Sequence, residues 1–141
     1  MIEIRNLTPQ SVGEAVAIDE AVFPESPWGR DSFLENIGNS FDHPLIAYAD
    51  GVPAGFGILR KLDDGEVLLI GVLPAHRRKG IGAQLLDQML RISGPDAKVF
   101  LEVRESNLPA RALYESRGFR EISRRKNYYT DPVEDAVIMT G

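Results

Sequence analysis

A short apolar segment that leads into three cations and two glycines constrains the fold of this chain more than any other feature. Val67 to Leu73 is too short and too rich in β-branched and aliphatic residues for a helix, and reads as a buried strand. The following segment, Gly80 to Ser93, has apolar residues at helical spacing, namely Ile81, Leu85, Met89 and Ile92. The order strand, loop, helix therefore predicts a tight loop at the amino-terminal end of a helix.

That loop has the composition of an anion-binding site. Gly80 and Gly82 carry no side chains, so backbone N–H groups can close on an anion at the positive end of the helix. Three consecutive cations precede them, Arg77, Arg78 and Lys79. We therefore expect a phosphorylated ligand, and in particular a pyrophosphate.

Length and composition predict one domain, residues 1–141, because 141 residues with 43% hydrophobic content can build one core but not two ordinary ones. No apolar run approaches the ~18 residues of a membrane helix, and the amino-terminal residues do not form a signal segment, so we expect a soluble cytoplasmic protein that does not bind membranes. The net charge of −5 argues against direct nucleic-acid binding. The absence of cysteine excludes disulfides, thiolate metal sites and a cysteine acyl-enzyme.

The remaining pattern predicts the element order β-α-α-β-β-β-α-β-α-β-β. The expected strands are residues 2–4, 45–49, 54–62, 67–73, 99–104, 120–127 and 135–139. The expected helices are one that begins at Thr8-Pro9 and others at about 30–37, 80–93 and 109–117. Asp50-Gly51 is a strong hairpin signal. We expect an α/β fold with a mixed, mostly antiparallel sheet, helices on both faces, and one crossover around the glycine loop.

Three kinds of phosphate-binding loop are compatible with closely spaced glycines. A P-loop needs Lys and Ser or Thr after its last glycine, but Ala83-Gln84 follow Gly82. A dinucleotide fingerprint would explain Gly80-x-Gly82 and Glu102, which lies twenty residues beyond Gly82. However, Leu85 replaces its third glycine, and about 60 residues remain, which is too few for the rest of a doubly wound domain.

The third kind of loop rests on a family resemblance. The segment R-R-K-G-I-G, Arg77 to Gly82, resembles the R-x-x-G-x-G loop that holds the pyrophosphate of coenzyme A in GCN5-related N-acetyltransferases. L-E-V-R-E-S-N at Leu101 to Asn107 and A-L-Y-E-S-R-G-F at Ala112 to Phe119 are similar to that family as well. Arg124 to Tyr129 and Glu134 to Met139 are most similar to its RimI-type ribosomal-protein alanine N-acetyltransferases.

The resemblance covers nearly the whole chain and implies the fold of that family, acetyl-CoA as cofactor, and a protein N-terminus as acceptor. In the RimI-type enzymes the acceptor is the N-terminal alanine of small-subunit ribosomal protein eighteen. It also implies that the backbone of Ile70, Gly71 and Val72 pairs with the pantetheine arm. The implied pyrophosphate loop is Arg78, Lys79, Gly80, Ile81, Gly82 and Ala83, to which Arg77 adds charge or loop structure.

Acetyl transfer by direct attack of the amine needs a base and a donor for the departing thiolate, but no metal. Strand alternation puts Glu102 opposite the core face of its strand, and the resemblance implies that it is the general base. The resemblance likewise implies that Tyr114 is the acid. Asn107 is placed to cap the helix that follows and to contact the cofactor. With two histidines and no cysteine, we expect neither a metal site nor a covalent intermediate.

The acceptor side is less constrained. Contacts are expected from the Phe23 to Trp28 loop and from the 127–135 hairpin, whose members Tyr128, Tyr129, Asp131, Glu134 and Asp135 could grip a basic peptide. RimI-type sequences commonly have a compact F-P-W, whereas this chain has three more residues between Pro24 and Trp28. Two alternatives remain open: an acetyltransferase for a small amine, and a non-catalytic acyl-CoA sensor.

Overall fold

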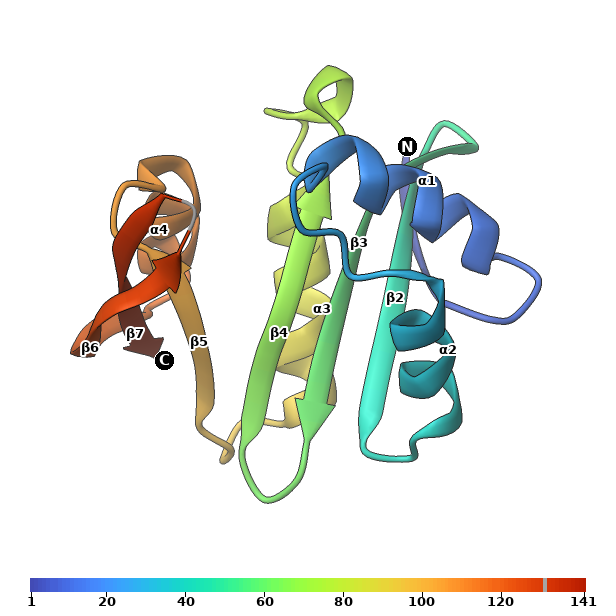
Figure 1. Cartoon of the computed structure of the whole chain (residues 1–141). Coiled ribbons are helices and arrows are strands. Elements are labelled where there is room, and N and C mark those ends of the chain that lie inside the picture. The colour runs from blue at the N-terminus through green and yellow to red at the C-terminus, as the bar shows by residue number, and fades with distance from the viewer. Residues whose placement is uncertain (131) are drawn as a thin grey trace.

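The structure, a computed structural model, describes residues 1–130 and 132–141, and its strands form one seven-stranded sheet (Figure 1). The strand order is β1-β2-β3-β4-β5-β7-β6, and every neighbouring pair is antiparallel except β4 and β5. The strands are β1 Ile2–Asn6, β2 Asp42–Ala49, β3 Val52–Lys61, β4 Gly65–Val72, β5 Val99–Arg104, β6 Arg120–Thr130 and β7 Val133–Thr140. This confirms the predicted α/β class and its mostly antiparallel sheet.

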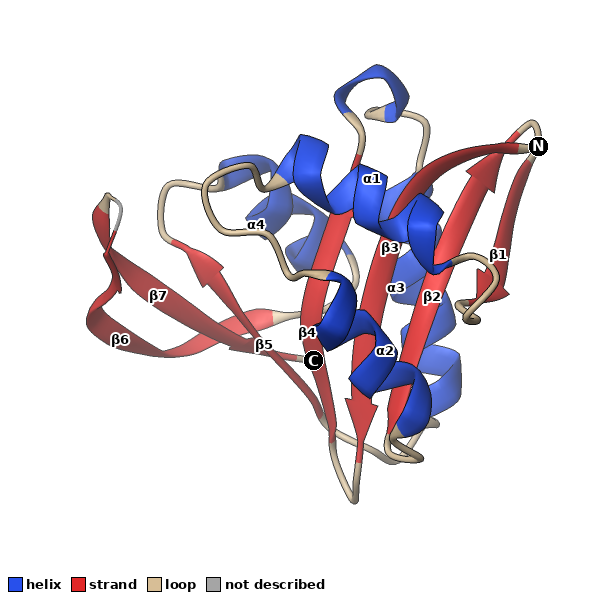
Figure 2. Cartoon of the chain, turned by 45° about the vertical axis from the view of Figure 1, so that its right-hand side comes forward, coloured by secondary structure: helices blue, strands red, loops and turns tan. Residues whose placement is uncertain are grey.

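Helices cover both faces of the sheet. Figure 2 shows α1 (Val12–Val22) and α2 (Arg30–Gly38) in front of β2 to β4, and α3 (Ile81–Ser93) behind them. The helix α4 (Leu108–Ser116) follows β5. Each face has its own hydrophobic core. One contains residues of α1 and α2 with Ile46 and Phe56, and the other contains residues of α3 with Leu45 and Ala47, and Tyr114 of α4. The central strands β2 and β3 are therefore buried on both sides, which explains their nearly continuous apolar sequences.

The sheet opens between β4 and β5. Their parallel pairing involves only residues 65–67 of β4, and ends where Val67 faces Leu101. At the next residue β4 has a β-bulge: Ile58 of β3 faces Leu69, while Leu59 faces Val67, so Leu68 is left over. A bulge bends its strand and increases its twist. Beyond it, β4 and β5 diverge, as Figure 1 shows, and residues 68–72 make no ladder with β5.

Most predicted elements are confirmed, and the differences lie at their ends. Asp50 and Gly51 both have positive φ, 51° and 83°, as the predicted hairpin turn requires. The first helix begins at Val12 and not at Thr8-Pro9, because Thr8 N–H donates to Ser11 Oγ and Ser11 N–H to the Thr8 carbonyl, both at 3.0 Å, which makes a separate turn. The strands β2, β6 and β7 are longer than predicted, since pairing with their neighbours extends them.

No helix in the described part of the chain is long and apolar enough to cross a membrane.

A buried carboxylate, Asp42, ties the start of β2 to its surroundings. Its side chain is 1% exposed and accepts hydrogen bonds from Arg60 Nε at 2.8 Å and Asn36 Nδ2 at 2.9 Å. Burial by itself raises the pKa of Asp42, but the hydrogen bonds from Arg60 and Asn36 and the charge of Arg60 outweigh it, so the pKa lies below its ordinary value of 3.8. Folding therefore favours the ionised form of this group.

Replacing Asp42 with Asn is expected to lower the free energy of unfolding at pH 7 by about 2 kcal/mol, because it removes a charge-assisted hydrogen-bond acceptor. A lowered folded-state pKa contributes stability above the unfolded pKa, and that contribution is lost as pH falls through the folded value. The difference between wild type and Asp42→Asn in urea unfolding should therefore shrink as pH falls below about 4. A difference that is constant from pH 7 to pH 3 would contradict this account.

Candidate active site

The free edge of β4 holds the residues predicted to pair with a pantetheine arm. Ile70, Gly71 and Val72 use one edge to pair with β3, and their other edge faces away from it, beyond the last residue that pairs with β5. Alternate N–H and C=O groups of this segment are thus directed into the opening between β4 and β5. Arg77 Nε donates to the Val72 carbonyl at 3.2 Å, so the Arg77 side chain supports the end of this strand.

Packing requires a glycine at position 71. A Cβ atom placed there would lie 2.9 Å from Phe56 Cε1 and 3.0 Å from Phe23 Cε2. The two rings meet edge to face, with centroids 6.4 Å apart. A side chain at Gly71 would push these rings out of the core and away from the strand edge.

The predicted anion loop forms one continuous turn between β4 and α3. A 3-10 turn, Pro74–His76, is followed by Arg78 with φ 67° and by Gly80 with φ 81° and ψ 14°, which is the left-handed N-cap of α3. The N–H groups of the first helical turn have no partner within the helix and point toward the loop. Gly82 lets α3 approach α4, because a Cβ atom there would lie 3.3 Å from Leu113 Cδ2. The arrangement suits a pyrophosphate.

Glu102 occupies the predicted position on β5. Val99, Leu101 and Val103 are buried, and Glu102 lies on the opposite face with its side chain 26% exposed. Arg125 Nε of β6 lies 3.2 Å from Glu102 Oε1. The sequence analysis missed Arg125. Its signal was the basic run at residues 124–126, which comes within reach of Glu102 only because β7 pairs with β5 on one side and with β6 on the other.

Tyr114 is the one buried residue of α4, with 8% of its surface exposed. Its ring packs on Phe119 at a centroid distance of 6.0 Å. Burial, with a smaller contribution from Tyr129, raises the pKa of Tyr114 to about 12, so the phenol keeps its proton at neutral pH. Asn107 caps this helix as predicted, since its Oδ1 accepts from Ala110 N–H at 3.2 Å.

Tyr129 links the two candidate catalytic groups. Burial and then the charge of Glu102 raise the pKa of Tyr129, and Tyr129 in turn contributes to the raised pKa of Tyr114. The fold therefore brings side chains from β5, α4 and β6 into one electrostatically coupled group. Sequence reasoning assigned Tyr129 only to the acceptor side.

The predicted acceptor loop and hairpin meet at a cavity of about 690 Å³. One wall is the α1–α2 loop and the other is β6, with Arg104 of β5 between them. The lining residues are Val22, Phe23, Pro24, Glu25, Ser26, Arg104, Tyr128, Tyr129 and Thr130. Arg104 lies over the Tyr129 ring at 4.3 Å from its centroid.

Three residues predicted to touch the acceptor do not line this cavity. Trp28 is turned into the protein, where its Nε1 donates to Asn36 Oδ1 at 2.8 Å. Glu134 pairs with Arg104 at 3.3 Å and so ties the hairpin to β5. Asp135 Oδ1 accepts from Asn127 N–H at 2.9 Å, which holds the hairpin together. Asp131 lies outside the described residues.

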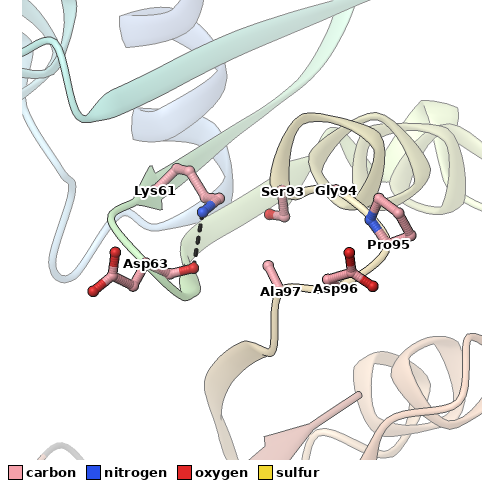
Figure 3. A pocket seen from close by; sticks show the side chains of 7 residues that line it. All are labelled: Lys61, Asp63, Ser93, Gly94, Pro95, Asp96 and Ala97. Atoms are coloured by element: carbon pink, nitrogen blue, oxygen red, sulfur yellow. Dashed lines mark hydrogen bonds between the residues drawn. The ribbon is translucent and has the colours of Figure 1, made fainter.

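A smaller hollow of about 310 Å³ lies at the other end of the sheet, between the β3–β4 turn and the end of α3 (Figure 3). Lys61 donates there to the Leu62 and Asp63 carbonyls. This hollow lies far from the glycine loop, because it adjoins the opposite ends of β4 and α3. Among the described residues, no group of His, Asp and Glu could hold a metal ion.

Comparison with known proteins identifies the family. Residues 13–119 match the Acetyltransferase (GNAT) family. The chain belongs to this family. It is therefore an N-acetyltransferase that uses acetyl-CoA.

Relatives of this GNAT chain include enzymes with a named acceptor. It is 40% identical, over 119 residues and 80% of its length, to the ribosomal protein bS18-alanine N-acetyltransferase of Escherichia coli (strain K12), 79% of which is covered. It is 37% identical over 140 residues to a Bacillus subtilis (strain 168) protein named as a candidate for that activity, covering 96% of this chain and 92% of the relative. The crystal structure of the Escherichia coli ribosomal-protein-S18-alanine N-acetyltransferase superposes with TM-score 0.88 at 34% identity, covering 99% of this chain and 92% of that one.

Replacing Gly80 with Ala is expected to raise the dissociation constant of coenzyme A about fivefold, measured by calorimetry. An alanine in the left-handed conformation is disfavoured by about 1 kcal/mol. If the backbone changes to avoid that conformation, the first N–H groups of α3 turn away from the anion, and a loss of about 1 kcal/mol corresponds to about fivefold in affinity.

Gly51→Ala is the matched control, because Gly51 has nearly the same φ of 83° but lies in the β2–β3 turn. It should lose stability without losing affinity. Equal coenzyme A affinity in the two variants would argue against the loop as the pyrophosphate site.

Proposed function

We propose that this GNAT chain transfers acetyl from acetyl-CoA to the α-amine of a protein N-terminus, with the N-terminal alanine of ribosomal protein bS18 as the favoured acceptor. The observation that carries the proposal is the cavity between the Phe23 to Ser26 wall and the Tyr128 to Thr130 wall, since Tyr129 connects it to Glu102 and Tyr114. A peptide end fits a cavity of about 690 Å³ that is open to solvent. The named relatives support the same acceptor.

The chemistry proposed is direct transfer. The lone pair of the neutral amine attacks the thioester carbonyl carbon, the C–N bond forms, and the C–S bond breaks. Glu102 accepts the proton that the amine nitrogen loses, and its pairing with Arg125 keeps the carboxylate in place beforehand. The thiolate leaves toward the Tyr114 side of the opening.

The pKa of Tyr114 limits what the phenol can do. The Tyr114 phenol has a pKa of about 12, whereas a thiol has a pKa of about 8.5. Transfer of the phenol proton to the thiolate is therefore thermodynamically unfavourable. Hydrogen-bond donation to the developing negative charge on sulfur carries no such cost. We propose that Tyr114 stabilises the leaving thiolate mainly as a donor and that water completes its protonation.

An α-amine suits this arrangement better than a lysine. Its ordinary pKa is about 8, against about 10.4 for lysine, so a lysine must be deprotonated at a cost of about 3 kcal/mol more. A single carboxylate such as Glu102 therefore suffices more readily for an N-terminus. Because all strands share one sheet, we also propose that residues 1–141 work as one acetyltransferase domain.

Purified protein is expected to acetylate a peptide with the N-terminus of ribosomal protein bS18, and Glu102→Gln should lower kcat/KM at least 100-fold through loss of the base. Tyr114→Phe should lower it about 100-fold through loss of the donor. Mass spectrometry of the peptide and a thiol-release assay measure the transfer.

Glu66→Gln is the matched control. Glu66 is exposed and lies where β4 pairs with β5, at the end of β4 that is remote from the glycine loop. It should leave the rate unchanged, and all variants should bind coenzyme A alike. Faster turnover of a panel of free amines than of the peptide would overturn the peptide assignment. Coenzyme A binding without turnover of any amine would favour a sensor.

A further inference from the structure

A buried carboxylate clamps the loop that forms one wall of the cavity. Asp19 of α1 is fully buried; its Oδ1 accepts from Trp28 N–H at 2.8 Å and its Oδ2 from Gly29 N–H at 2.9 Å. A buried carboxylate is costly unless hydrogen bonds satisfy it, and here both oxygens are used on one segment. Residues 23–27 form a loop that leaves α1 at its carboxyl-terminal end, and the clamp holds the residues that follow it, Trp28 and Gly29, back against the same helix.

Side-chain hydrogen bonds extend the clamp to the start of β2 and the end of β3. Trp28 Nε1 donates to Asn36 Oδ1 at 2.8 Å, and Asn36 Nδ2 donates to Asp42 Oδ2 at 2.9 Å. Arg60 of β3 then pairs with Asp42 at 2.8 Å. Hydrogen bonds thus run from α1 through the loop and α2 to β2 and β3. Asn36 is 3% exposed, so a broken link would leave a buried polar group without a partner.

None of these network residues lines the cavity, but the wall lies between the clamped points. Phe23 to Ser26 line it, whereas Asp19 precedes them and Trp28 follows them. Phe23 also packs on Phe56 and reaches the position above Gly71 of β4. The position of the loop therefore sets the distance between the wall and the strand edge expected to hold the acetyl donor.

We propose that Asp19, Trp28 and Asn36 are positioning residues that hold the acceptor wall and so determine the KM for the acceptor. This inference rests on the proposed function, because it takes the cavity as the acceptor site. The loop has three residues more than the compact F-P-W pattern, so ordering it costs more conformational entropy. The hydrogen bonds to Asp19 and Asn36 order the loop before the acceptor binds, so acceptor binding does not bear that cost.

Trp28→Phe tests the link from the loop to Asn36, and Asp19→Asn tests the end of the network on α1. The first removes the indole donor but keeps an aromatic ring, and the second keeps the shape but replaces one acceptor oxygen with an NH₂ group. With the bS18 N-terminal peptide varied at saturating acetyl-CoA, each variant should raise the acceptor KM about tenfold. The KM for acetyl-CoA should stay unchanged, and the amide hydrogens of Phe23, Glu25 and Ser26 should exchange faster.

Ile58→Val is the matched control, because Ile58 is fully buried in the same hydrophobic cluster as Trp28 but makes no polar contact with the loop. It should lower Tm and leave both KM values unchanged. If Trp28→Phe lowers Tm but leaves the acceptor KM unchanged, the inference is overturned, because the network then stabilises the fold without affecting the acceptor. If the unaltered protein acetylates no peptide, the proposed function fails instead. Unchanged amide exchange of Phe23, Glu25 and Ser26 in the variants would then overturn the clamp by itself.

Discussion

The short parallel contact between β4 and β5 is the constraint on which the rest of the structure depends. Three residues of each strand are paired, and the bulge at Leu68 then turns β4 away. Had the pairing continued, the backbone groups of Ile70 to Val72 would be used up within the sheet. Because it stops, residues 68–72 make no ladder with β5, so this edge of a central strand is open to an extended ligand, and Arg77 holds the Val72 carbonyl at its end.

The two sides of the opening are built by different means. On the β4 side, consecutive residues supply a strand edge, a turn with two left-handed residues and a helix N-terminus, so the geometry is mostly backbone. On the β5 side, Glu102, Tyr114 and Tyr129 come from three elements, and their coupling depends on side-chain packing and charge. The first side tolerates changes in side chains that preserve the turn, whereas the second depends on the identity of each group.

Sequence reasoning succeeded where one physical effect dominated. Alternation along β5 predicted its bounds and the orientation of Glu102, because one face is buried and the other is not. The same reasoning failed at Thr8-Pro9, where a Thr8–Ser11 turn competes with the helix start. It also assigned Trp28 to the acceptor, although an indole that can donate to a buried amide is better satisfied inside the protein.

By itself, the sequence determined the strand, the glycine loop and the helix α3, because they are consecutive and each follows from local periodicity and from the lack of side chains at Gly80 and Gly82. Only the tertiary structure decided how residues far apart in the chain meet: Arg125 with Glu102, Asp19 with Trp28, and the α1–α2 loop with β6. The physical reason is that such contacts depend on strand register, on the bulge at Leu68, and on which buried donor forms a hydrogen bond with which buried acceptor. Neither hydrophobic period nor composition contains that information.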